Sequence, residues 1–179
     1  MARRLVPLIV LAALLSAAPA QADGLRAGAG RADITPRPGY YMFGWVRSDA
    51  RAHGQLTRLF ARTIVLQRGK RKVALVSADM GAIPNGLVVD AARRVAGRGY
   101  SARNVIVSAS HTHSAATGYF NYPAFNTVAP TDTTPGQFAI GEPADEKLYS
   151  FLSRQIAASI RRADRDLAPA RVGWGGARG

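Results

Sequence analysis

The tripeptide His111-Thr112-His113 has the clearest chemical potential in the sequence, because it places two of the chain's three histidines two residues apart. It follows an apolar run at residues 104–110 that has the character of a β-strand. Side chains two positions apart on a strand point to the same face. Two imidazoles on one side of a strand end form a natural first half of a zinc site, although both could also be ordinary polar residues that close a strand.

The segments before the histidines predict a β-hairpin followed by a strand–helix–strand crossover. Residues 56–67 and 72–78 have strand patterns and are separated by a turn at 68–71. A helix is expected from Pro84 to about Val95, ahead of the third strand at 104–110. A right-handed crossover makes strands 72–78 and 104–110 parallel neighbours. The expected buried stripe of the helix is Leu87, Val88, Ala91, Ala92 and Val95.

This topology bears on the histidines, because the ligand crevice of such sheets lies beyond the carboxyl ends of the parallel strands. Asp79 follows one of these strands, and His111 and His113 follow the other. We therefore expect Asp79 to lie near the histidines, which strengthens the prediction of a metal or catalytic site.

The remaining segments complete an α/β fold with a mixed sheet of at least three strands. Residues 24–55 are rich in Gly, Pro and aromatics and predict a loop with a short strand at most. Residues 114–142 predict a long loop, and Pro143 opens an amphipathic helix. Its apolar face comprises Leu148, Phe151, Leu152, Ile156 and Ile160, opposite Arg154, Arg161, Arg162 and Arg165. An incipient strand is expected at 171–174, and the domain is expected to be incomplete.

The first 22 residues predict a secretory signal peptide. Arg3 and Arg4 precede an apolar stretch, and Ala20-Gln21-Ala22 fits the rule for cleavage after a small residue. The apolar stretch is short for a membrane span; a retained amphipathic anchor is the alternative. The mature part, 23–179, is expected to be secreted, periplasmic or extracellular.

Composition narrows the chemistry further. The chain has no cysteine, so any metal site must use His, Asp, Glu or Tyr. The net charge of +13 comes from scattered arginines, and no basic run is interleaved with stacking aromatics. This pattern disfavours nucleic acid as a partner and leaves an anionic membrane surface as a possible one. The oligomeric state cannot be predicted from these patterns.

An ordered set of motifs resembles the amino-terminal domain of the neutral (alkaline, non-lysosomal) ceramidases. Order and spacing agree from about Gly28 to Trp174. The matching segments are Gly30-Arg31-Ala32-Asp33-Ile34-Thr35-Pro36, Met42-Phe43-Gly44-Trp45, Ala61-Arg62, Ser77-Ala78-Asp79-Met80-Gly81, Asn104 to Ser114 and Gly118-Tyr119-Phe120.

The resemblance implies a zinc-dependent amidase that cleaves the N-acyl bond of ceramide, or of a similar N-acyl lipid, to sphingosine and a fatty acid. It implies that His111 is a zinc ligand, that His113 lines the active site beside the metal, and that Asp33 and Asp79 shape the site or act as turn residues. Among these, His113 and Asp79 are the candidate catalytic residues. The apolar rings of residues 40–43 and 119–120 would line a path for a lipid tail or pack in the core.

The sequence also departs from the family pattern. Ala115-Ala116-Thr117-Gly118 stands where family members usually have a Gly-Pro-Gly-like turn. The resemblance implies that the other zinc ligands and the serine used at the amide lie far downstream. We therefore predict that this chain alone is inactive, because a catalytic zinc needs about three protein ligands. The alternatives are a related hydrolase of another amide or ester, and an exported basic lipid-binding module.

Overall fold

The structure is a computed structural model that describes residues 24–45, 49–126, 144–173 and 175–176. The predicted signal peptide and most of the Thr/Pro-rich part of the long loop lie outside the described residues. The elements are β1 (Arg26–Asp33), β2 (Phe60–Arg68), β3 (Arg71–Ala78), α1 (Asn85–Arg93), η1 (Ala96–Arg98), β4 (Val105–Ala109), η2 (Pro123–Asn126), α2 (Glu146–Arg165) and β5 (Ala168–Pro169).

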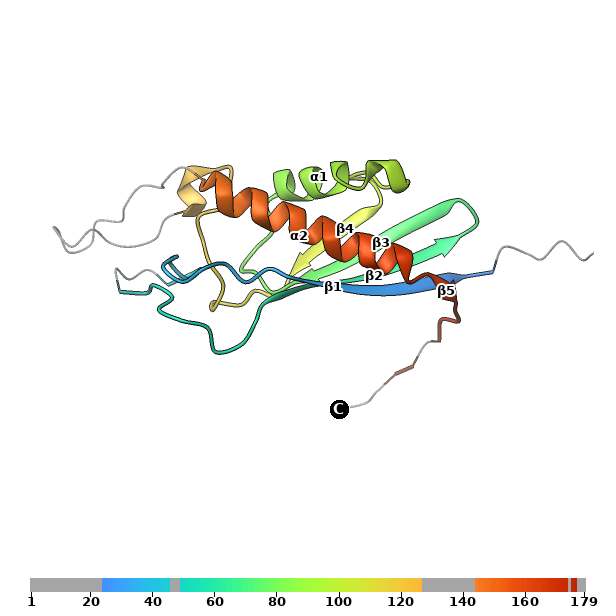
Figure 1. Ribbon diagram of the computed structural model, residues 1–179, viewed down its shortest axis with the longest axis horizontal. Coiled ribbons are helices and arrows are strands. Elements are labelled where there is room, and N and C mark those ends of the chain that lie inside the picture. Colours follow the sequence, from blue (N-terminus) through green and yellow to red (C-terminus); the bar gives the residue numbers. More distant parts are fainter. Residues whose placement is uncertain (1–23, 46–48, 127–143, 174, 177–179) are drawn as a thin grey trace, which may run out of the picture.

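The five strands form one mixed sheet in the order β4-β3-β2-β1-β5, with α1 and α2 packed on the same face (Figure 1). Strands β3 and β4 are parallel, and the other neighbouring pairs are antiparallel. The predicted α/β class and mixed sheet are confirmed. No helix within the described ranges is both long and apolar enough to cross a membrane.

The predicted hairpin and crossover are confirmed with shifted boundaries. Strand β2 begins at Phe60 rather than at 56, and β2 and β3 are joined through Gly69, whose φ is +56°. A positive φ is what a two-residue hairpin turn requires. Helix α1 begins at Asn85, after Pro84, and ends at Arg93. The predicted stripe faces the core, fully buried except for Val88, which is partly buried against it.

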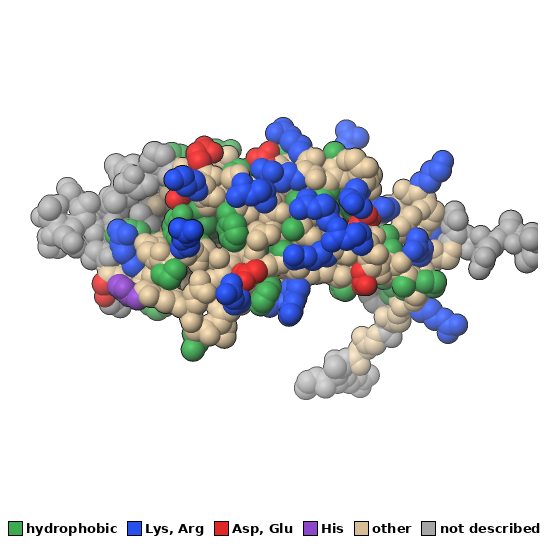
Figure 2. Space-filling model, viewed as in Figure 1, with side chains coloured by type: hydrophobic (Ala, Val, Ile, Leu, Met, Phe, Trp, Pro, Cys, Tyr) green, Lys and Arg blue, Asp and Glu red, His purple; other side chains and the backbone are tan. Residues whose placement is uncertain are grey.

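Helix α2 confirms the predicted amphipathic helix, although it begins at Glu146 rather than at Pro143. The Asp145 side chain accepts hydrogen bonds from the backbone N–H groups of Lys147 (2.8 Å) and Leu148 (2.9 Å) and so caps the helix. Four of its five predicted apolar residues are fully buried, and Phe151 is partly buried. Arginine and lysine side chains are spread over the outward face (Figure 2).

Strand β1 corrects the prediction of a loop with a short strand at most over 24–55. Its eight residues pair with β2 from Arg26 to Asp33, and β1 lies between β2 and β5. The glycines that suggested a loop lie under α2: a Cβ at Gly30 would be 2.4 Å from the backbone nitrogen of Ala163. The strand therefore uses glycine because the helix packs directly on its backbone.

The predicted strand at 171–174 is wrong. Among the described residues the last strand is β5 at 168–169, which pairs with β1, and residues 171–173 are not in a strand. Ala168 and Pro169 follow α2 after a short turn, so the chain reaches the edge of β1 before the apolar Val172 that suggested the strand.

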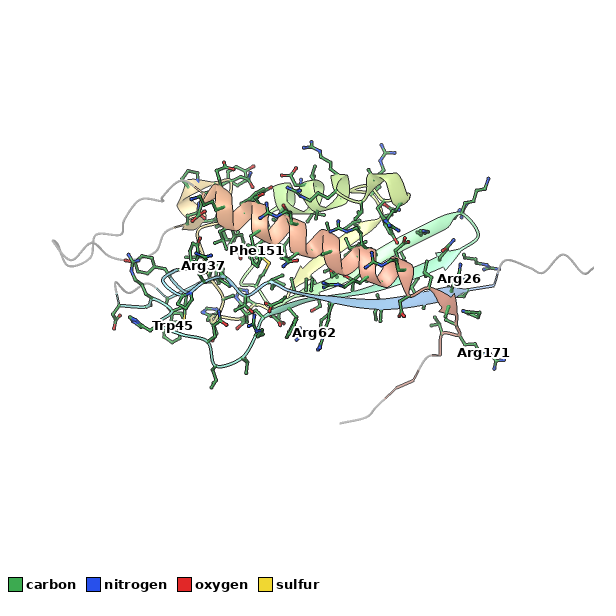
Figure 3. All side chains as sticks on the ribbon, viewed as in Figure 1. Arg26, Arg37, Trp45, Arg62, Phe151 and Arg171 are labelled. Carbon is green, nitrogen blue, oxygen red and sulfur yellow. The ribbon has the colours of Figure 1, made fainter. Side chains whose placement is uncertain are left out.

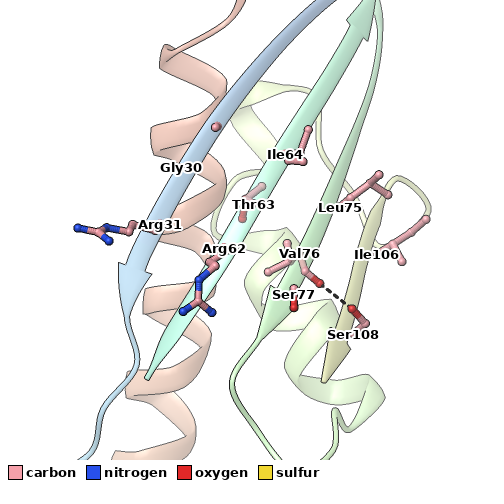
Figure 4. Close-up of a pocket in the computed structure, with 11 residues that line it drawn as sticks. Gly30, Arg31, Arg62, Thr63, Ile64, Leu75, Val76, Ser77, Ile106 and Ser108 are labelled. Carbon is pink, nitrogen blue, oxygen red and sulfur yellow. Dashed lines mark hydrogen bonds between the residues drawn. The ribbon is translucent and has the colours of Figure 1, made fainter. Parts of the chain in front are cut away.

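No element among the described residues covers the sheet face opposite the helices. Ile64, Leu75 and Ile106 are direct partners across β2, β3 and β4. They are 52%, 40% and 56% exposed and lie on one side of the sheet with the helices behind it (Figure 4). The next row towards the histidines is polar, with Arg62, Ser77 and Ser108.

Candidate metal and catalytic site

His111 and His113 lie side by side just after the end of β4. Their ring centroids are 5.3 Å apart and the rings are inclined by 76°. The proximity agrees with the prediction, but its structural basis differs, because β4 ends at Ala109 and His111 has a φ of +58°. His111 is the single non-glycine residue with positive φ in the described part of the chain. A strained backbone of this kind is often found at functional sites.

The hydrogen bond of His111 defines which of its nitrogens is free. Nδ1 lies 2.7 Å from the carbonyl oxygen of Gly81. A carbonyl oxygen can only accept, so Nδ1 carries the proton and the Nε2 lone pair remains available. Nε2 has no hydrogen-bond partner among the described residues, and the side chain is exposed. Metal-binding histidines commonly have this arrangement, with one nitrogen donating to a carbonyl.

The Met42-Phe43-Gly44-Trp45 segment contacts His113, which remains exposed. The indole Nε1 of Trp45 donates to the backbone carbonyl of His113 at 2.9 Å. The Phe43 ring meets both imidazoles edge-on, with centroids 5.8 Å from each. Figure 3 shows Trp45 at the end of the molecule that holds this loop. This segment, which the sequence singled out only by resemblance, thus supports the histidine pair.

The aromatic residues 119 and 120 pack in the core. Tyr119 is 1% and Phe120 is 6% exposed. These two rings therefore pack in the core, which was the alternative to lining a surface path for a lipid. Tyr40 is half-buried, and its hydroxyl donates to Asp145 at 2.8 Å, beside the start of α2. Burial raises the pKa of Tyr119 to about 12.

The Asp79 segment lies beside the histidines, but the Asp79 carboxylate is bound to β2. The backbone N–H of Ser110 donates to the carbonyl of Ala78 (2.9 Å), which joins the two strand ends as expected. The carboxylate of Asp79 accepts from the backbone N–H of Phe60 at 2.9 Å and from Arg62 at 2.8 Å. These contacts hold the ends of β2 and β3 together, and the catalytic assignment of Asp79 stays a prediction.

Two further polar residues are Asp33, the last residue of β1, and His53, the third histidine of the sequence. Asp33 accepts hydrogen bonds from the backbone N–H of Thr35 (2.8 Å) and from Arg58 (2.6 Å), the geometry of a turn residue. Burial raises its pKa, but these hydrogen bonds outweigh burial and leave it below the ordinary value. His53 is exposed in a separate loop.

His111 offers one free ring nitrogen, which is one of the several ligands that a metal ion needs. No group of three or more His, Cys, Asp or Glu side chains is placed to hold a metal within those residues. Gly81, which fixes His111, was missed as a site residue; the sequence signal was a glycine just after a buried strand.

Comparison with known proteins gives a consistent result. Residues 25–178 match the family described as neutral/alkaline non-lysosomal ceramidase, N-terminal. The chain is 29% identical over 165 residues to the neutral ceramidase of Pseudomonas aeruginosa, covering 88% of this chain and 23% of the relative. It is 31% identical over 156 residues to that of Mycobacterium tuberculosis, covering 83% and 23%.

A solved structure agrees with the sequence matches. The crystal structure of neutral ceramidase from Pseudomonas aeruginosa superimposes with a TM-score of 0.70 at 26% identity, over 82% of this chain and 22% of that one. The chain therefore spans about a quarter of the length of these relatives.

Proposed function

The chain belongs to the neutral/alkaline non-lysosomal ceramidase family, and we propose that it contributes to a zinc-dependent amidase that cleaves the N-acyl bond of ceramide. The products would be sphingosine and a fatty acid. The relatives named neutral ceramidase support the reaction class.

One observation supports zinc binding most directly: the carbonyl of Gly81 holds the proton of His111 on Nδ1, which leaves Nε2 free on an exposed residue. In the proposal, Nε2 of His111 binds zinc. When bound, zinc polarises the amide carbonyl and acidifies a bound water or alcohol. His113 lies close enough to exchange a proton with a substrate group beside His111.

In the proposal, Asp79 positions other residues of the site. Asp79 holds the end of β3 against β2 through Phe60 and Arg62, which fixes the segment that carries Gly81. Further zinc ligands would come from outside the described residues, as the resemblance implies. On this account the chain by itself does not hydrolyse ceramide.

A related hydrolase of another amide or ester is the second candidate. The segment Ala115-Ala116-Thr117-Gly118 lies against residues 41–43: the N–H of Phe43 donates to the carbonyl of Ala115 (2.8 Å) and the N–H of Thr117 donates to the carbonyl of Tyr41 (2.8 Å). Because this departure from the family pattern directly follows the histidines, it would alter the fit of a substrate.

The proposal also includes location and membrane contact. The predicted signal peptide would export the protein, and the exposed arginines of α2 (Figure 2) would favour an anionic membrane surface that presents the lipid substrate. Such binding should weaken steeply as the salt concentration rises.

A substrate panel tests the function. The protein purified from its native host, in the length and assembly in which it occurs there rather than as the isolated chain, would be assayed with a short-chain ceramide, an N-acyl amino acid, a simple anilide and a carboxylic ester. We expect zinc-dependent release of sphingosine from the ceramide in preference to the other reactions. Preference for the ester or the anilide would support the second candidate, and no hydrolysis of any member would contradict both.

A further inference from the structure

The segment Gly81-Ala82 lies between the buried ring of Tyr119 and the imidazole of His111. The Tyr119 hydroxyl donates to the carbonyl of Ala82 at 2.8 Å and accepts from the N–H of Ala82 at 3.3 Å. The preceding carbonyl, that of Gly81, accepts the Nδ1–H of His111 at 2.7 Å. One phenol thus binds both polar backbone groups of the residue next to the histidine's acceptor.

Tyr119 is itself firmly held. Its side chain is 1% exposed, and its ring stacks on Phe120 with centroids 4.6 Å apart. The fully buried side chain of Asn126 bonds both backbone groups of Phe120, at 2.9 Å and 2.8 Å. The Tyr119 hydroxyl therefore has a fixed position, and its hydrogen bonds fix the position of the Ala82 backbone.

A second route from this cluster to the histidine uses aromatic rings alone. Phe120 stacks on Phe43 with centroids 6.1 Å apart, and Phe43 meets His111 edge-on at 5.8 Å. The ring of Tyr119 supports this aromatic route, whereas its hydroxyl serves only the backbone of Ala82. Removing the hydroxyl while keeping the ring therefore separates the two routes.

We infer that the hydroxyl of Tyr119 is a positioning group for His111: by fixing the Gly81 carbonyl, it selects the tautomer with the proton on Nδ1. Nε2 is then the nitrogen that offers its lone pair. The inference rests on the proposed function only for its consequence, that this lone pair binds zinc. The tautomer itself can be measured without any metal.

The test is long-range proton–nitrogen NMR on the metal-free chain at about pH 8, where imidazoles are mostly neutral. The wild-type chain should show His111 predominantly protonated on Nδ1. In Tyr119→Phe the ratio of the Nδ1–H to the Nε2–H tautomer should fall roughly 2- to 10-fold, the equilibrium equivalent of one net hydrogen bond.

Two control variants separate positioning from general stability. Tyr100→Phe removes a hydroxyl that donates to Asp164 at 2.8 Å from a side chain 3% exposed, so it should destabilise the fold without changing His111. Phe43→Leu replaces a ring that lies against both Gly81 and His111, but it keeps the hydrogen bonds of the Tyr119 hydroxyl, so it should change the tautomer ratio less than Tyr119→Phe does. If Tyr119→Phe does not fold, a wild-type chain with His111 protonated on Nε2 would still overturn the inference.

The outcomes are distinct. A folded Tyr119→Phe chain with the wild-type ratio would overturn the inference, as would an equal shift in Tyr100→Phe or in Phe43→Leu. Loss of zinc binding by itself would not be decisive here, because it tests the proposed function. A shifted tautomer with no role for zinc would sustain the inference and refute the function.

Discussion

The backbone of Gly44 lies against the imidazole ring of His113, with no space between them for a side chain. A Cβ at position 44 would stand 2.5 Å from Cε1 and 2.6 Å from Nδ1 of the ring, and Gly44 has a φ of +77°. Glycine therefore meets two requirements here: a left-handed backbone and close contact with a histidine of the candidate site.

Gly44→Ala should displace His113 and destabilise the fold by about 1–3 kcal/mol, the combined effect of backbone strain and overpacking. Thermal denaturation and the NMR signals of the His113 ring would measure both effects. Gly39→Ala is a matched control, because Gly39 has a φ of +106° and no atom within 4 Å of an added Cβ. Unmoved His113 signals in Gly44→Ala would contradict the close contact.

Gly30→Ala should lower the free energy of unfolding by about 1–3 kcal/mol, because the new Cβ would press β1 away from α2. It would stand 2.4 Å from the Ala163 nitrogen and 2.5 Å from the Ser159 oxygen. Urea denaturation would measure the change. Gly97→Ala, where an added Cβ meets nothing within 4 Å, should change stability by no more than about 0.5 kcal/mol. Equal effects would show that β1 and α2 are not in close contact.

Asp164 should make the stability of the fold depend on pH. Burial raises the pKa of its carboxyl, but hydrogen bonds from Lys72 (2.7 Å), Tyr100 (2.8 Å) and Arg98 (3.2 Å) outweigh burial and leave the pKa below the ordinary 3.8. Since the folded pKa is the lower one, the stabilisation is present above about pH 4 and is lost as the pH falls through the lowered value.

Asp164→Asn should therefore destabilise the fold by about 2 kcal/mol at neutral pH, through weakened charge-assisted hydrogen bonds. The difference between variant and wild type should shrink on acidification. Urea midpoints measured at intervals from neutral to acidic pH would follow both proteins. A difference that stays constant down to low pH would mean that the carboxylate charge is not the source of the stabilisation.

The isolated chain should not hydrolyse ceramide. Residues 23–179, refolded with zinc and offered a short-chain ceramide, should release no sphingosine above the rate without protein, because the described residues place no group of three ligands around a metal. Sphingosine release that disappears with a chelator and returns with zinc would contradict this prediction.

The hairpin, the crossover and the amphipathic helix could be predicted because their apolar residues recur with clear periods. Strand β1 could not, because Arg26–Asp33 has no large apolar side chain and its glycines imitate a loop. Its strand character depends on α2, which begins more than a hundred residues later. Strand β5 was misplaced for a similar reason: pairing with β1, not local pattern, determines it.

The candidate site was predicted in part. The sequence identified the histidine pair, but strand alternation could not foresee the positive φ of His111. The contact of His111 with Gly81 and the contacts of His113 with Gly44 and Trp45 join segments about 30 to 70 residues apart. Asp79 was expected to lie near the histidines, and its segment does, but Arg62 and Phe60 engage its carboxylate from the neighbouring strand.

The central claim is that Nε2 of His111 binds zinc, and metal content tests it most directly. Zinc per polypeptide would be measured in the protein from its native host and in His111→Ala and His53→Ala variants expressed there. The account predicts about one zinc in the wild type and in His53→Ala and a large loss in His111→Ala. Unchanged zinc in a folded His111→Ala protein would contradict the account.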